Sequence, residues 1–146
     1  MIRVDDVAAR LEAQVPSLAG LIGGASDFTR MITSGALPQQ PKRAFVLPGD
    51  LMGGAADAAT GLFRQGFVQT VSVALFVRVA ADPTGKRGLD EVTPLIRDVV
   101  RAIAGWVPDA CLGTFVLGRG ALVSMEAGST VYQIDFNLND QLRIDT

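Results

Sequence analysis

The feature that most constrains the fold is the stretch from Gly66 to Ala80, where apolar and β-branched residues recur with a period of two. One face carries Phe67 and the odd-numbered residues from Val71 to Val79, and only Gln69 interrupts it. A strand of this length would span roughly 50 Å, well beyond the length of an ordinary strand. We therefore predict one long strand that bends or projects past the core.

Helical periodicity is present in two other stretches. Val4 to Val15 and Leu89 to Ala104 each repeat apolar residues every three or four positions, with charged residues elsewhere. A shorter helix is predicted at Ala25 to Met31, where neighbouring glycines weaken the signal. The two longer helices each have one apolar face, so both should pack on a sheet.

The remaining strands are short, and turn residues separate them. The predicted strands are 43–47, 114–117, 121–126 and 130–138, with turns at 118–120 and 127–129. Residues 50–65 contain Gly53, Gly54 and Gly61 among small residues, which predicts a long mobile loop. The whole chain, residues 1–146, is then a single α+β domain. Its sheet would be mostly antiparallel, with four to five strands and two main helices packed on one face.

Composition points to burial against other subunits. Apolar residues make up 49% of the chain and charged residues 19%, below the ~25% of an average soluble domain. No apolar run approaches the ~20 residues of a membrane span, and a net charge of −2 does not resemble a nucleic-acid footprint. A large subunit interface explains the apolar excess, and a well-filled, alanine-rich core is the alternative.

Catalytic chemistry has few candidates in this sequence. The chain has no histidine, which excludes the Ser-His and Cys-His nucleophile pairs and histidine metal sites. The glycine clusters lack the lysine of a phosphate-binding loop, and residues 135–140 lack the glycine of a calcium loop. The single Cys111 fits a small buried side chain in an intracellular protein. We expect no enzyme activity, no cofactor and no metal.

Several segments together resemble a known family. They are the strand ending in Phe45-Val46-Leu47-Pro48-Gly49, the glycine-rich stretch, the long strand 67–80, Asp82-Pro83-Thr84-Gly85, Gly105-Trp106-Val107-Pro108, and the final strands with Tyr132 and Phe136. In this order they resemble the tail terminator (tail completion) proteins of long-tailed bacteriophages. The resemblance covers nearly the whole chain. It rests on turn residues and on the apolar pattern, and not on a catalytic signature.

The resemblance implies a structural role in the virion. It implies a ring of six copies on the end of the tail tube, which stops tube polymerisation and offers its other face to the head. The partners would be further copies of the chain, the tail tube protein and a head–tail connector or neck protein. DNA would pass through the lumen without specific binding, and assembly would take place in the host cytoplasm. The alternatives are another head-to-tail joining (neck) protein, a small α+β ligand-binding module or enzyme that uses carboxylates, and a monomeric domain.

Contact residues are predicted on physical grounds, since the family has no motif that fixes them. They lie in the 50–65 stretch, on the long strand, in the 82–88 turn and on the polar side of the last strand. The candidates are Asp50, Leu51, Met52, Phe63, Arg64, Arg78, Asp82, Lys86, Arg87, Gln133, Asp135 and Asn137. Arg78 is expected to pair with Asp135 or Asp82 across the sheet, or to face a partner subunit.

Overall fold

A computed structural model of the chain describes residues 3–35, 37–80, 82, 84–126 and 128–145. Within them lie three α-helices, one 3₁₀ turn and five strands. In chain order these are α1 (Val4–Gln14), η1 (Pro16–Leu18), β1 (Ile22–Gly23), α2 (Ala25–Ser34), β2 (Lys42–Ala59), β3 (Leu62–Arg78), α3 (Lys86–Ile103), β4 (Phe115–Glu126) and β5 (Ser129–Asp145).

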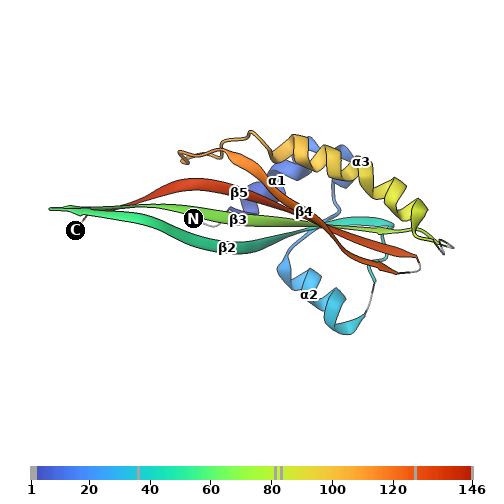
Figure 1. The fold of residues 1–146 in the computed structure, drawn as a ribbon. Coiled ribbons are helices and arrows are strands. Elements are labelled where there is room, and N and C mark those ends of the chain that lie inside the picture. Colours follow the sequence, from blue (N-terminus) through green and yellow to red (C-terminus); the bar gives the residue numbers. More distant parts are fainter. Residues whose placement is uncertain (1–2, 36, 81, 83, 127, 146) are drawn as a thin grey trace.

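The strands form one sheet in the order β1-β2-β3-β5-β4. Only the short β1–β2 pair is parallel, and the other three pairs are antiparallel. Figure 1 shows α1 and α3 on one face of the sheet and α2 on the other. The predicted α+β class with a mostly antiparallel sheet is confirmed, and the two long helices share one face as expected. The shorter predicted helix becomes α2 on the opposite face.

The main core lies between the sheet and the α1–α3 layer. The odd-numbered residues of β3 from Val71 to Val77 point into it, as the period-two pattern predicts. Ile134, Phe136 and Leu138 of β5 lie beside them and are buried. Alternation places every second side chain of both strands against the helices, and this burial supplies most of the driving force for folding.

A smaller core holds α2 against the other face. Phe28 of α2 stacks on Phe45 of β2 with ring centroids 5.3 Å apart. Ala74, Phe76 and Val131 complete this cluster. The cluster lies at one end of the sheet, so α2 leaves the rest of this face uncovered.

Three strands continue beyond the helices as a projecting ribbon, which we call the arm: residues 49–68 of β2 and β3, and 139–145 of β5 (Figure 1). The prediction of a mobile loop at 50–65 is wrong, because these residues are strand pairs closed by a turn at Thr60 and Gly61. Two register shifts in β2, between Pro48 and Leu51 and between Gly53 and Ala56, add residues to that strand. The predicted projection of the long strand past the core is confirmed.

Other boundaries also differ from the predictions. Gly118-Arg119-Gly120 is part of a continuous β4 instead of a turn. A Cβ added at Gly118 would lie 2.6 Å from the Asn137 amide nitrogen, so glycine serves close packing here. β5 runs on to Asp145, because its last residues pair with the β3 side of the arm.

Candidate interaction surfaces

One side of the sheet forms a broad surface without a helical cover. We call it the open face: the α2 side of β3, β5 and β4 beyond the reach of α2. Gln133 and Asp135 of β5 lie there beside Arg119, Ala121 and Val123 of β4, around a shallow hollow. The sequence-predicted polar residues of the last strand therefore lie on an accessible surface.

Hydrogen bonds fix the polar side chains of the open face. The Ser72 hydroxyl donates to Asp135 Oδ1 over 2.6 Å, and the Gln133 amide donates to the same oxygen over 3.1 Å. The Thr70 hydroxyl donates to Asn137 Oδ1 over 2.9 Å. The network holds these half-exposed groups in one arrangement before any partner binds, which lowers the entropy cost of binding.

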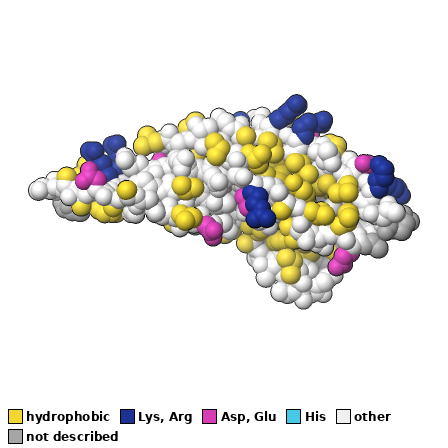
Figure 2. Space-filling model, in the orientation of Figure 1, with side chains coloured by type: hydrophobic (Ala, Val, Ile, Leu, Met, Phe, Trp, Pro, Cys, Tyr) yellow, Lys and Arg dark blue, Asp and Glu magenta, His cyan; other side chains and the backbone are white. Residues whose placement is uncertain are grey.

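The edge strand β4 presents a strongly apolar surface. No strand pairs with its outer side in the described part of the chain. Five of its large apolar side chains are 42–52% exposed: Val116, Leu117, Leu122, Val123 and Met125. Figure 2 shows hydrophobic side chains gathered over the region of β4 and β5, between α3 and α2. Clustered exposure of this kind marks an interaction surface.

The arm carries five predicted contact residues: Asp50, Leu51, Met52, Phe63 and Arg64. Met52 is 66% exposed, and it borders a hollow of about 420 Å³ formed where glycines remove side chains from the ribbon. Arg64 lies opposite Asp57 on one side and opposite Arg143 on the other. No helix covers this ribbon (Figure 1), and both of its faces are exposed beyond the base, where Cys111 and Leu112 bond to Asp140.

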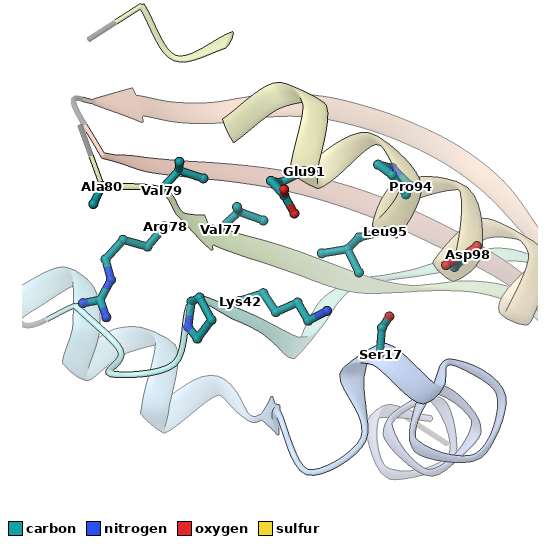
Figure 3. Close-up of a pocket in the computed structure, with 11 residues that line it drawn as sticks. Ser17, Lys42, Val77, Arg78, Val79, Ala80, Glu91, Pro94, Leu95 and Asp98 are labelled. Atoms are coloured by element: carbon teal, nitrogen blue, oxygen red, sulfur yellow. The ribbon is translucent and has the colours of Figure 1, made fainter. Parts of the chain in front are cut away.

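A groove lies at the end of the sheet away from the arm. It has a volume of about 560 Å³ and lies between α3 and the paired ends of β2 and β3. Figure 3 shows Lys42 and Arg78 on the sheet side and Glu91 and Asp98 on the α3 side. The groove therefore has a basic and an acidic side, and the Ser17 hydroxyl also lines it.

Arg78 does not make either of the predicted pairs. Its guanidinium donates to the Gln39 backbone carbonyl over 2.7 Å. Asp135 lies on the open face bonded to Ser72, and Asp82 is turned toward the start of α3, so neither carboxylate is oriented toward Arg78. The expected intramolecular ion pair is wrong, and a contact to another subunit stays a prediction.

The 82–88 segment is divided between buried and exposed residues. The Asp82 side chain is 5% exposed and accepts hydrogen bonds from the backbone of α3, so the free chain does not offer it as a contact surface. Lys86 and Arg87 are exposed, and Lys86 forms an ion pair with Asp90 over 3.4 Å. Pro83 of this predicted turn lies outside the described residues.

Cys111 forms a structural contact with Asp140. The thiol lies 3.0 Å from Asp140 Oδ2, at the base of the arm. Burial and the hydrogen bond to Asp140 raise the pKa of the Cys111 thiol, which favours its protonated form. Among the residues that the structure describes, no group of three or more His, Cys, Asp or Glu residues is placed to hold a metal ion.

None of the described helices is long and apolar enough to cross a membrane.

In a comparison with families of proteins, the whole chain, residues 1–146, matches the family described as phage tail terminator protein. The chain belongs to the phage tail terminator family. A search of curated proteins finds no match.

Membership of the tail terminator family agrees with the surfaces described above. The family places the chain among structural proteins of the bacteriophage tail, which associate with other tail and head components. The arm, the open face and the edge of β4 are the exposed surfaces of this chain that could make such associations. The resemblance drawn from the sequence is confirmed.

The structure groups the predicted contact residues at separate places. Asp50 to Arg64 lie on the arm, and Gln133, Asp135 and Asn137 lie on the open face. Arg78, Lys86 and Arg87 lie at the end of the sheet away from the arm (Figure 1). Sequence reasoning missed the apolar edge of β4, because nothing in a sequence shows which strand ends a sheet.

Proposed function

We propose that this terminator-family chain forms a hexameric ring on the end of the tail tube, where it stops tube polymerisation and provides the surface for head attachment. The observation that supports this most directly is the whole-chain family match. The exposed apolar side chains of the arm and of the edge strand β4 also support it, because contacts between copies would bury them.

A ring needs two different surfaces on each copy. In a head-to-tail contact one patch meets a different patch on the neighbour, and the contact repeats until the ring closes. The arm lies at one end of the sheet and the groove at the other, while β2 and β4 lie toward its opposite sides. The molecule therefore offers unlike surfaces at the two ends and at the two edges of its sheet.

The arm is the best candidate for the contact with the tube. It extends beyond the packed layers, as Figure 1 shows, and Met52 and Leu51 expose apolar surface on it. Binding of the arm to the last layer of tube subunits would occupy the sites at which further subunits add. The tube would then stop growing without any chemical step.

The charge of the chain suits a channel for DNA. A net charge of −2 gives no excess of basic side chains to hold phosphates by counterion release. DNA would therefore pass through the lumen without specific binding.

Phage lacking this protein provide the test. The proposal expects overlong tails without heads, visible by negative-stain microscopy. A neck protein would leave tails of normal length, and an enzyme of unrelated role would leave both length and attachment unchanged. Tails of wild-type length in the absence of the protein would therefore contradict the proposal.

A single substitution on the arm then tests its role. Met52→Asp places a charge on the arm at its most exposed large apolar residue, which is 66% exposed. Ile32→Asp is the matched control, because it places a charge on α2 at a residue that is 62% exposed. We expect complementation to fail with Met52→Asp and to succeed with Ile32→Asp. Equal complementation by both variants would remove the arm from the tube contact.

A further inference from the structure

We infer that neighbouring copies join through their sheets, with the outer edge of β4 in one copy pairing antiparallel with the outer edge of β2, residues 46–59, in the next copy. The inference rests on the proposed ring and names the strands that build it. The free edge of each strand is therefore paired with another copy of this chain.

The first observation is the condition of the β4 edge. β4 is a strand of 12 residues with β5 as its one described neighbour, and Arg119 and Glu126 are its charged residues. Soluble proteins protect such edges with charges, prolines or covering segments, because the free backbone groups otherwise pair with another chain. β4 has two charged residues and two register shifts, but it also carries the five exposed apolar side chains described above, so stretches of its edge suit pairing.

The second observation is a matching edge on the other side of the sheet. β1 pairs with β2 only at Ala44 and Phe45. From Val46 to Ala59, β2 has β3 as its sole described neighbour. The two free edges are of similar length, and both belong to strands already ordered by pairing within the chain.

Side-chain size makes the β4 edge complementary to the second half of the β2 edge, residues 53–59. The β4 edge bears large residues, whereas residues 53–59 of β2 read Gly-Gly-Ala-Ala-Asp-Ala-Ala. Small residues leave room for the large side chains of β4, as cross-strand packing requires. Pairing of β4 with a second β4 would instead place large residues against large ones.

Charge supports the same pairing. Arg119 of β4 is exposed and forms no ion pair with any described residue, and the same holds for Asp50 and Asp57 of β2. Pairing of the β4 edge with the β2 edge therefore brings opposite charges together. Two β4 edges in a symmetric dimer would bring arginine toward arginine in the middle of the strand.

Strand direction allows an antiparallel contact. β2 is antiparallel to β3, β3 to β5, and β5 to β4, so β4 runs opposite to β2. A copy set beside the first with its strands in the same sense presents β2 antiparallel to β4. The same contact can then be repeated by every copy, and it gives a ring where the rotation between neighbouring copies closes.

Disulfide trapping in assembled tails provides a direct test. In a Cys111→Ser background, Leu117→Cys is combined in turn with Leu51→Cys, Ala56→Cys or Ala58→Cys. The strand register places all four side chains on the α1–α3 side of the sheet. The three β2 positions test three different alignments of β4 along β2 of the neighbouring copy. Within one chain β3 and β5 separate β2 from β4 by about 14 Å, beyond the ~7 Å Cα reach of a disulfide. Any disulfide between these positions must therefore join two copies.

The expected result is a ladder of covalent oligomers on a non-reducing gel, ending at the number of copies in the ring, for at least one of the three pairs. Leu117→Cys alone should give no dimer. A ring without a ladder for any pair, or a dimer from Leu117→Cys alone, would overturn the inference while leaving the ring itself intact. Failure of the proposed function has a different signature, namely tails of normal length in the absence of the protein.

A charged edge gives an independent readout. Val123→Lys places a charge at a 52% exposed position of β4, and Leu89→Lys does the same at a 38% exposed position of α3. We expect Val123→Lys to shift the particle from ring mass to monomer mass in light scattering, or to be absent from tails. Leu89→Lys should behave as wild type, with circular dichroism showing that both variants fold. A complete ring with Val123→Lys would contradict the inference.

Discussion

Asp82 accepts a hydrogen bond from the backbone N–H of Gly88 over 2.8 Å at the start of α3. Its other carboxylate oxygen accepts from the Arg87 N–H over 3.3 Å. The first N–H groups of a helix lack partners within the helix, and a negative charge there also interacts favourably with the helix dipole. A buried side chain from the preceding segment therefore fixes where α3 begins.

Replacement of this carboxylate should destabilise the protein. We expect Asp82→Ala to lower the free energy of unfolding by about 1–2 kcal/mol, because the buried Gly88 N–H loses its acceptor. Asp90→Ala is the control, since the Asp90 carboxylate is exposed and its pair with Lys86 is worth less than about 0.5 kcal/mol. Urea denaturation measures both, and equal values for the two variants would contradict the capping role.

The turn at the tip of the arm depends on backbone conformation alone. Gly61 has a φ of +82°, and a Cβ placed there would meet nothing within 4 Å. Gly61→Ala should therefore cost about 1 kcal/mol through backbone strain. Gly66→Ala, on extended backbone with equally free space, should be neutral or slightly stabilising. Amide hydrogen exchange in residues 57–64 should be faster in Gly61→Ala and unchanged in Gly66→Ala.

The attachment of α2 should depend on one aromatic residue. Phe28 is 8% exposed and stacks on Phe45. We expect Phe28→Ala to cost about 3 kcal/mol and to speed hydrogen exchange in α2 more than in α3. Ile32→Ala, at a 62% exposed position of the same helix, should cost less than about 1 kcal/mol. Uniform acceleration in both helices would show that α2 is not a separately opening unit.

The base of the arm should be sensitive to acid. Burial favours a higher pKa for the Asp140 carboxyl, but hydrogen bonds from Cys111, Gln141 and Leu112 outweigh it and lower the pKa below the usual 3.8. Because the pKa of this carboxyl is lower in the folded state than in the unfolded state, its charge stabilises the protein at pH values above the unfolded-state pKa. This stabilisation is lost as the pH falls through the folded-state pKa.

Asp140→Asn should consequently be less stable than wild type at pH 7, and the difference should shrink as pH falls below about 4. Urea denaturation at pH 7, 5 and 3 measures this. Cys111→Ala removes one hydrogen-bond donor to Asp140 and should raise the folded-state pKa of that carboxyl. The stability that depends on its charge should then be lost at a higher pH. A difference between Asp140→Asn and wild type that is constant with pH would contradict the role of the carboxylate charge.

The sequence was most informative where one side of an element faces the core. β3 and β5 alternate because every second side chain packs under α1 and α3, and α3 itself shows a clear apolar stripe. These patterns gave the fold class and the two main helices. The start of α3 was predicted three residues late, at Leu89 instead of Lys86, because the capping role of Asp82 depends on its tertiary position.

The arm gave no such signal. Residues 50–59 of β2 are exposed in the single chain and mostly small, so no alternation of buried and exposed positions marks them as a strand. Their extended conformation comes from pairing with β3, which is information held in another segment. Likewise, Gly118 and Gly120 suggested a turn in β4, but the neighbouring Asn137 and Tyr132 side chains account for the missing Cβ atoms. The apolar edge of β4 became visible only with the strand order.

The third strand of the arm has a consequence for folding on the ribosome. Leu62 pairs with Asp145, which is 83 positions later in the chain (145 minus 62). Until synthesis reaches β5, the distal part of β2 and β3 is a two-stranded hairpin, which is marginally stable in water. The arm is therefore completed only after β5 has been translated, so a nascent chain that lacks β5 cannot present a finished arm to a growing tube.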